Sequence, residues 1–393
     1  MGRELLTRDR GNRDAWRAPP RHRAAGPILL LVALIAIAAA PGPATASQLR
    51  GAVLTPNFQW PPPNGVTDGQ SDRETQAACA LGATVMRVVV NWARLEPGPG
   101  QFDPRYVGRV DRMVGQLAGC GIPVELTIMG TPCWDTTDPL AGSKCVTPTW
   151  TLYPPRLPGA YGAVVTWSLL RWGSHLAALE VWNEPNNGAF WVGSAQQYAD
   201  LVNTAVDAAR AIGSPVPILA GALAGADVGF LGQLYAAGMR GQSGISMHPY
   251  TLRPQSGFFD PMEPSGRREG QSVFRSSIAN VHDAMLAAGD RGDIWLTEFG
   301  YSVCPATPYC ISARRQAQWT VDAIRAAARI PFVRATILYS LRDAGNSADW
   351  NNRFGLLRRD FDPRPSFAAV RRTLGQLDRR RGRKSGHRHR HHR

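Results

Sequence analysis

The chain has 393 residues and a formal net charge of +14, which is spread unevenly along the sequence. Seven arginines against three acids give residues 1–46 a charge of +4, and eight basic residues against one acid give residues 378–393 a charge of +7, which leaves +3 for residues 47–377. The high isoelectric point therefore belongs to the two ends. No aromatic residue interleaves the basic C-terminal run, which argues against nucleic acid as a partner.

The first 46 residues are typical of a secretory signal peptide. Arginines dominate the start, an apolar run extends from Pro27 to Ala40, and a small-residue A-T-A site follows at 44–46. Cleavage after this site would leave Ser47 as the first residue of a secreted protein. The apolar run is shorter than the roughly 20 residues that span a bilayer. Because the basic leader is unusually long, the alternative is an uncleaved anchor that holds the rest of the chain outside the membrane.

Between the two ends, eight short β-rich apolar runs alternate with amphipathic stretches. Strands are expected at 52–56, 85–92, 123–130, 178–185, 216–222, 244–250, 293–301 and 333–341. Helices are expected at 71–82, 105–119, 196–212, 271–288, 312–329 and 364–377. Such alternation indicates a parallel sheet covered by helices. Eight units predict an α/β fold, a (β/α)8 TIM barrel in a single domain over 47–377, and no G-x-G-x-x-G follows the first strand to favour a dinucleotide-binding fold.

The basic C-terminal block, residues 378–393, is expected to be a disordered, solvated tail because its like charges repel each other. A functional interpretation is that the tail contacts an anionic cell-envelope polymer. Its histidines are not expected to form a dedicated metal site. No obligate protein partner is evident. The four histidines are His387, His389, His391 and His392.

All six cysteines fall within 47–377, and an even number in an exported protein predicts disulfides. Connectivity cannot be deduced from sequence, since six cysteines allow fifteen pairings. Buried free thiols are the alternative for the first two cysteines in the chain. Proximity in the sequence suggests the pairs Cys133–Cys145 and Cys304–Cys310, with Cys79 and Cys120 pairing between two neighbouring helices.

Two long irregular stretches, 130–156 and 251–270, follow the third and sixth predicted strands. Loops of this length inside a compact domain are usually lids or binding loops. In a barrel both would lie on the C-terminal face, where substrates bind.

Polar side chains stand at the ends of several predicted strands. A carboxylate at the end of an apolar strand is poor core design unless it has a chemical role. Two acids in one barrel mouth are what glycoside hydrolysis requires, one to protonate the leaving oxygen and one to attack the anomeric carbon. The alternative is that both acids satisfy backbone donors at helix N-termini. The candidate residues are Asn183 and Glu184, His248 and Tyr250, Glu298, and Arg87 within the second strand.

The strings WNEPN at 182–186, HPY at 248–250 and TEFG at 297–300 resemble clan A glycoside hydrolases, the barrel superfamily of cellulases, mannanases and xylosidases. The resemblance covers 47–377 in order. Within the clan, NWARLEPGPGQFD at 91–103 and YSLRDAGN at 339–346 are similar to family 39-like and family 5-like enzymes of actinobacteria.

The resemblance implies a role for each candidate residue. Glu184 would be the acid/base and Glu298 the nucleophile, in a double displacement that needs no metal or organic cofactor. Asn183 would bind the sugar 2-hydroxyl, His248 and Tyr250 would match the sixth-strand pair whose tyrosine orients the nucleophile, and Arg87 would keep the nucleophile ionised. A purely structural ion pair is the alternative for Arg87. The chain departs from the family at Leu338-Tyr339-Ser340, where many relatives place a tryptophan platform, which leaves the sugar open.

Aromatic side chains near strand exits are candidates for stacking on the flat C–H faces of sugars, with ordinary packing as the alternative for each. The preferred platforms are Trp92, Trp134 and Trp350, and the others are Trp60, Trp182, Trp191 and Phe258 or Phe259. The sequence thus predicts a secreted enzyme that cleaves β-linked O-glycosidic bonds of an extracellular poly- or oligosaccharide, with its two carboxyl groups about 5–5.5 Å apart. The alternatives are a transglycosylase with the same site and a catalytically silent carbohydrate- or cell-envelope-binding barrel.

Overall fold

A computed structural model describes residues 47–54, 67–141, 150–250, 273–305, 310–345 and 349–388. The predicted signal peptide lies outside these residues. So do Trp60 and the 251–270 loop with Phe258 and Phe259.

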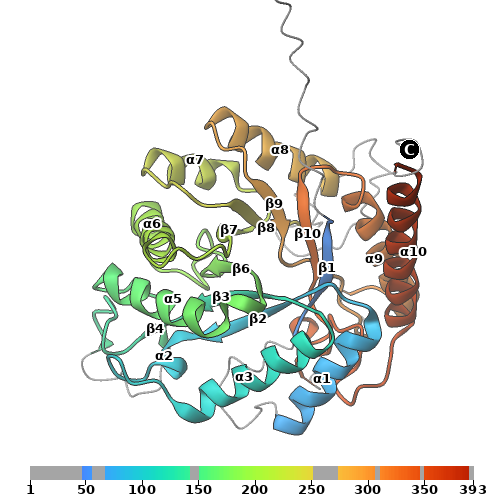
Figure 1. Cartoon of the computed structure of the whole chain (residues 1–393), viewed down its shortest axis with the longest axis horizontal. Coiled ribbons are helices and arrows are strands. Elements are labelled where there is room, and N and C mark those ends of the chain that lie inside the picture. The colour runs from blue at the N-terminus through green and yellow to red at the C-terminus, as the bar shows by residue number, and fades with distance from the viewer. Residues whose placement is uncertain are drawn as a thin grey trace, which may run out of the picture. The chain divides into compact units, whose positions relative to one another are not determined.

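Eight parallel strands close into a barrel in the order β1-β10-β9-β8-β7-β6-β3-β2 (Figure 1). Each of the eight predicted strands overlaps one strand of this barrel, which confirms the predicted (β/α)8 fold. A separate two-stranded sheet joins β4 (Thr131–Pro132) to β5 (Trp150–Thr151) in the loop that follows the third barrel strand. The barrel strands are β1 (Leu49–Val53), β2 (Val85–Asn91), β3 (Val124–Met129), β6 (Leu176–Val181), β7 (Ile218–Ala224), β8 (Gly244–His248), β9 (Asp293–Leu296) and β10 (Val333–Leu338).

Helices surround the barrel as an outer layer (Figure 1). The six predicted helices correspond to α1 (Asp68–Leu81), α3 (Pro104–Gly119), α6 (Ala195–Ala211), α8 (Val273–Ala287), α9 (Ala313–Ala327) and α10 (Pro365–Arg388). Three further helices were not predicted, namely α2 (Trp92–Leu95), α5 (Pro158–Trp172) and α7 (Val228–Ala236). The sequence of α5 is apolar on nearly every side, so it shows no helical period, and α2 and α7 are short. The described residues also include two short 3-10 helices, η2 (Gly173–His175) and η3 (Trp350–Asn352).

Helix α10 continues past the predicted end at 377 and runs to Arg388. The predicted boundary between the barrel domain and the basic tail, at Asp378, therefore lies inside a helix. Residues 378–388 are helical and not the disordered tail that was expected. Arginine and lysine are good helix formers, and cations near a helix C-terminus interact favourably with its dipole.

A polar layer lies inside the barrel beneath its C-terminal end. All seven residues of β2 are buried, and among them Arg87 pairs in register with Glu125 of β3. On the other side of β3, Thr127 pairs in register with Glu180 of β6. Because alternate residues of a barrel strand face the interior, these four side chains share one region of the barrel interior.

Two disulfides are described, and both match the predicted pairing. Cys79 in α1 is bonded to Cys120 at the C-terminal end of α3, and Cys304 is bonded to Cys310. Cys133 is also disulfide-bonded, while its predicted partner Cys145 lies outside the described residues. Free thiols at the first pair are therefore excluded.

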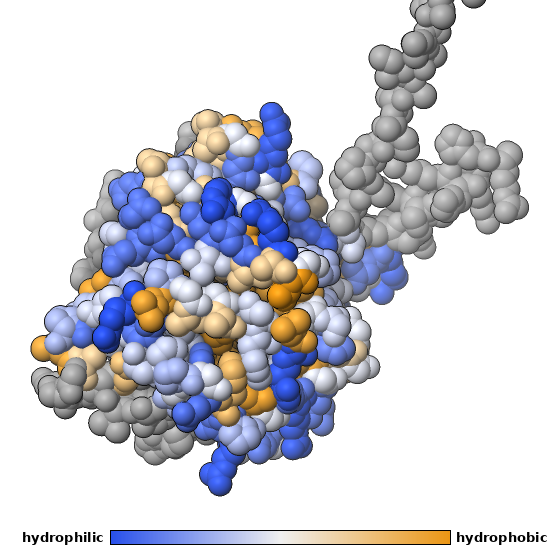
Figure 2. All heavy atoms as spheres, turned by 60° about the vertical axis from the view of Figure 1, so that its left-hand side comes forward, coloured by the Kyte–Doolittle hydropathy of each residue, from blue (hydrophilic) through white to orange (hydrophobic). Residues whose placement is uncertain are grey.

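Within the part of the chain that the structure describes, no helix combines the length and the apolar character needed to cross a bilayer. The apolar run at 27–40 does not belong to that part. On the face shown in Figure 2, hydrophobic side chains occur in small separate patches among hydrophilic ones, as is usual for a solvated layer of amphipathic helices.

Candidate active site

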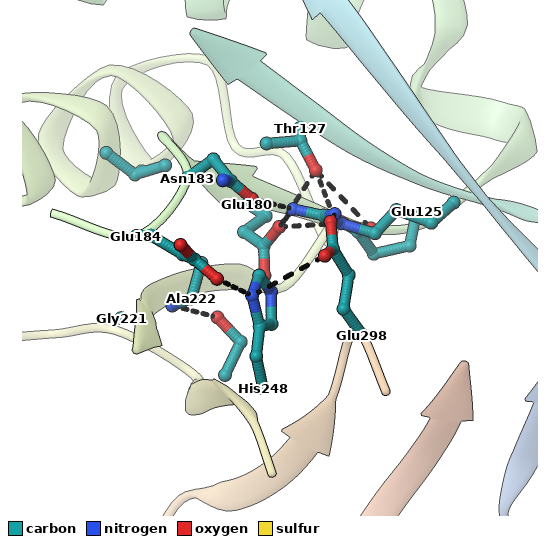
Figure 3. A network of polar contacts seen from close by, with 12 residues as sticks. Glu125, Thr127, Glu180, Asn183, Glu184, Gly221, Ala222, His248 and Glu298 are labelled. Atoms are coloured by element: carbon teal, nitrogen blue, oxygen red, sulfur yellow. Dashed lines mark hydrogen bonds and ion pairs between the residues drawn. The ribbon is translucent and has the colours of Figure 1, made fainter. Parts of the chain in front are cut away.

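Four of the predicted site residues meet at the C-terminal end of the barrel. Arg87 comes from β2, Glu184 follows β6, His248 ends β8, and Glu298 follows β9. Figure 3 shows Glu184 and Glu298 on opposite sides of the His248 ring. The structure therefore brings the two predicted carboxylates into one site, although they are 114 positions apart in the sequence.

The segment that carries Glu184 leaves β6 in an unusual backbone conformation. Trp182 and Glu184 have φ angles of 66° and 44°, a region that residues with a side chain rarely adopt. The backbone N–H of Glu184 donates to the carbonyl of Ala222 at 3.1 Å. In β7 the neighbouring Gly221 has a φ of 111°, and a Cβ there would come within 2.5 Å of the Ser246 carbonyl oxygen. Strained backbone of this kind clusters at functional sites, where the surrounding structure holds it in place.

The carboxylate of Glu184 is held by two neighbours and has a side-chain exposure of 12%. Its Oε1 lies 2.8 Å from His248 Nδ1, and its Oε2 accepts a hydrogen bond from Asn187 Nδ2 at 2.8 Å. Burial raises the pKa of Glu184, but the hydrogen bond and charge of His248, together with the hydrogen bond from Asn187, bring it below its ordinary value. Asn187 was not among the predicted site residues; it lies two residues beyond the WNEP motif.

The carboxylate of Glu298 contacts three predicted partners. Arg87 Nη1 donates to its Oε1, and the hydroxyl of Tyr250 donates to its Oε2 at 3.2 Å. His248 Nδ1 lies 3.7 Å from the same Oε2. Burial, followed by the charge of Glu298, raises the pKa of Tyr250 well above its ordinary range, so its hydroxyl stays protonated and can act as the donor.

His248 is fully buried between the two carboxylates. Burial alone would lower the pKa of His248, but the negative charges of Glu298 and Glu184 raise it above its ordinary value. Carboxylate and imidazole atoms of Glu184, His248 and Glu298 lie within 4.8 Å of one another. These donor types also suit a metal ion, but hydrogen bonds already engage each of the three side chains.

Asn183 is oriented by Arg87, whose Nη2 donates to its Oδ1 at 2.9 Å. Since the amide oxygen is the acceptor in this bond, the amide NH2 remains as a donor for a ligand. This arrangement fits the predicted role of Asn183 in binding a sugar hydroxyl.

Two buried glutamates beneath the site were missed by the sequence analysis. Glu180 Oε2 accepts from Arg87 Nε at 2.9 Å and Nη2 at 2.5 Å, and Glu125 Oε2 lies 3.1 Å from the same Nε. Thr127 Oγ1 donates to Glu180 Oε2 at 2.8 Å. The signal was present in the sequence, because each glutamate interrupts an otherwise apolar strand. Both glutamates lie within their strands, whereas the predicted site residues were mostly those at strand ends.

The prediction that Trp92 is a sugar platform is wrong. Its ring is fully buried, its indole N–H donates to Glu96 at 2.7 Å, and it packs edge-on against Trp134 and Tyr161. The short helix α2 starts at Trp92 and turns the ring into the core instead of the barrel mouth. Trp182 and Trp191 are also buried and pack against each other, with ring centroids 5.0 Å apart.

Trp134 and Trp350 keep partial exposure, and their role as platforms stays a prediction. The ring of Trp350 lies 5.9 Å from that of Phe354. Phe354 in turn contacts Tyr250 and Tyr339 at centroid distances of 6.1 and 5.3 Å. An aromatic group that includes Tyr339 therefore adjoins Tyr250, the tyrosine that donates to Glu298.

The closed parallel barrel is the fold of known (β/α)8 glycoside hydrolases. No family model matches the sequence, and no curated protein matches it significantly. A family 39 glycoside hydrolase from Bacteroides cellulosilyticus WH2 has a similar structure, with a TM-score of 0.62 and 18% identity over 84% of this chain and 63% of that one. The chain thus spans less than two thirds of that protein.

Two further solved structures are similar in the same way. A monomeric β-xylosidase from Caulobacter crescentus CB15 has a TM-score of 0.60 and 20% identity, over 82% of this chain and 67% of its own. A GH5_18 protein from Streptomyces cattleya, solved with GlcNAc, has a TM-score of 0.61 and 18% identity, over 84% of this chain and 80% of its own. At these identities the likeness establishes the fold.

Proposed function

We propose that this protein is a retaining β-glycosidase that acts on an extracellular poly- or oligosaccharide. The observation that carries the proposal is the placement of Glu184 and Glu298 in one barrel mouth, with carboxylate oxygens within 4.8 Å of each other. This separation is closer to the roughly 5–5.5 Å between the carboxyl groups of retaining enzymes than to the roughly 6.5–9.5 Å of inverting ones, so it favours direct attack by one carboxylate.

In the first step Glu298 attacks the anomeric carbon, the bond from that carbon to the glycosidic oxygen breaks, and the departing oxygen takes a proton from Glu184. In the second step Glu184 removes a proton from water, which attacks the same carbon and releases Glu298. Two inversions give net retention.

The hydrogen bond between His248 and Glu184 accounts for the proton that the first step requires. The pKa of Glu184 is lowered and that of His248 is raised, so in the empty site the shared proton lies toward the imidazole. Protonation of the leaving oxygen by Glu184 then draws this proton across the 2.8 Å separation between the two residues.

Similar proteins support the choice of β-linked sugars. The Caulobacter protein is a β-xylosidase, and a GH5_18 variant from Streptomyces cattleya was solved with Manβ1-4GlcNAc. Two described disulfides support a location outside the reducing cytosol. The predicted signal peptide agrees with that location.

The test is hydrolysis of a panel of aryl β-glycosides and β-linked polysaccharides by the full chain and by Glu298→Gln. A matched surface variant, Asp207→Asn, changes an exposed carboxylate that pairs with Arg240. Cleavage by the wild type and by Asp207→Asn, with loss in Glu298→Gln, is the expected result. Activity that survives in Glu298→Gln, or no cleavage of any panel member, would contradict the proposal.

A further inference from the structure

The two oxygens of the buried Glu180 carboxylate have different surroundings. One of them, Oε2, faces Arg87 and Thr127. Oε2 accepts from two Arg87 nitrogens and from Thr127 Oγ1, so the lone pairs of that oxygen are fully used. Arg87 then reaches the nucleophile with Nη1 and Asn183 with Nη2. Glu180 thereby fixes the direction in which the guanidinium points.

The second oxygen of Glu180 has a different surrounding. Oε1 is buried and makes no hydrogen bond of normal geometry among the described residues, although the Ser246 hydroxyl is near enough to Glu180 to help lower its pKa. His248 Nε2 is likewise buried without a hydrogen bond among these residues. Glu180 and His248 interact electrostatically, and Figure 3 shows the Glu180 carboxylate next to the His248 ring. The His248 ring nitrogen makes no hydrogen bond and the Glu180 oxygen makes none of normal geometry, and leaving either buried group unsatisfied is costly.

We propose that Glu180 is a positioning residue for both catalytic carboxylates, because one oxygen holds Arg87 against Glu298 and the other orients His248 toward Glu184. The inference rests on the proposed function of those two carboxylates. A negative oxygen behind Nε2 keeps the proton on that nitrogen, so Nδ1 is the atom that exchanges a proton with Glu184. A buried carboxylate behind a histidine has this effect on the tautomer in other enzymes.

Glu125 differs from Glu180 although both are fully buried beside Arg87. Burial alone would raise the pKa of Glu180, but Arg87 and His248 lower it below its ordinary value. Burial and the charge of Glu180 instead raise the pKa of Glu125 well above its ordinary value, against the effect of Arg87. Three ionised glutamates around one arginine would bury a net negative charge, and a proton on Glu125 reduces that cost.

The groups that face Glu180 and His248 come from every neighbouring element. Charged side chains, three tyrosine hydroxyls and the Ser246 hydroxyl interact with Glu180, with His248 or with the two carboxylates beside them. These groups are Arg87 of β2, Glu125 of β3, Glu184 after β6, Glu298 after β9, Ser246 of β8, Tyr161 of α5, Tyr198 of α6 and Tyr250 after β8.

The experiment compares Glu180→Gln with Glu125→Gln in the full chain. Glutamine has nearly the same shape, and Glu125 lies on the side of the network away from His248 (Figure 3). Glu180→Gln should lower kcat about 10²-fold and move the pH limbs of kcat/KM. Glu125→Gln should stay within about threefold of the wild type, because burial and the charge of Glu180 already disfavour the ionised form of Glu125, and a neutral glutamine replaces it with little change of shape. Equal losses and unchanged pH limbs in both variants would overturn the proposal.

A second readout needs no turnover, so it separates this proposal from the proposed function. In protein labelled with ¹⁵N-histidine, and with His248→Asn used for assignment, the His248 ring should keep Nε2 protonated over the whole titration. The pH midpoint of the His248 titration should be lower in Glu180→Gln than in the wild type and unchanged in Glu125→Gln. If Glu180→Gln does not fold, the wild-type spectrum decides: a neutral His248 with its proton on Nδ1 would overturn the role of Glu180.

Discussion

Nδ1 of His248 lies 2.8 Å from Oε1 of Glu184, in a site that the barrel wall largely shields from water. The pKa of the histidine is raised and that of the carboxyl is lowered. Between these two values the residues form an ion pair with one shared proton. The proton chemistry of the site therefore belongs to the pair and not to either residue alone.

This pair predicts a pH-dependent contribution to stability. The raised pKa of His248 means that its contribution is fully present below the ordinary histidine value and is lost as pH rises through the folded-state value. We expect His248→Asn to lower Tm more at about pH 5.5 than at about pH 8.5, with each kcal/mol lost giving about 2–4 °C. Thermal unfolding across this range is the measurement. The exposed His175→Asn serves as control, and a deficit that grows with pH would contradict the sign.

Glu184→Gln should reveal general acid catalysis by its dependence on the leaving group. With a sugar or alkyl leaving group, kcat/KM should fall about 10²–10⁴-fold, since the departing oxygen then lacks its proton donor. An aryl group that leaves readily as an anion needs little protonation, so the loss should be much smaller. Steady-state rates on a series of such substrates provide the test. A loss of the same size for every leaving group would argue against an acid role.

Asp135 in the loop after β4 predicts the opposite pH trend. The residue is buried, its Oδ1 accepts from the Leu157 N–H at 3.1 Å, and burial raises its pKa to about 6. Since the folded state favours the neutral acid, stability falls as pH rises toward and through that value. Asp135→Asn should raise Tm at about pH 8, by about 2–4 °C per kcal/mol, and match the wild type near pH 4. Calorimetry at the two pH values measures this, and a less stable variant at pH 8 is the contrary result.

The Cys79–Cys120 bond closes a loop of 41 positions between α1 and the end of α3. Replacing both cysteines with alanine should lower the free energy of unfolding by about 2–5 kcal/mol, because the unfolded chain gains freedom. Catalysis should remain, since neither helix end carries a site residue. Denaturant unfolding and kcat/KM at 25 °C test the two statements. Unchanged stability would show that the bond does not constrain the unfolded chain.

The fold was predictable because a parallel barrel requires buried strands, and eight near-continuous apolar runs stand out in the sequence. The site residues at strand ends were predictable for the same reason, since parallel strands bring their carboxyl ends to one face. Glu184, His248, Tyr250 and Glu298 indeed meet there. Once the barrel topology is predicted, the strand-end motifs also predict which side chains lie close together.

The errors came from features that depend on side-chain direction. Trp92 stands at the exit of β2, but the turn of α2 directs its ring inward, and no pattern in the sequence reports that rotation. Glu125 and Glu180 lie within strands, where an isolated charge indicates a partner on a neighbouring strand. The partner, Arg87, is identified by strand register, which the sequence does not specify.

The stereochemistry of hydrolysis tests the central claim most directly. Proton NMR can record the anomer that forms first when the wild-type full chain cleaves the best aryl β-glycoside from the panel, before mutarotation mixes the products. The paired carboxylates predict that the β-anomer appears first, because Glu298 and then water each attack with inversion. Initial release of the α-anomer would mean a single displacement by water and would contradict the assignment of Glu298 as nucleophile.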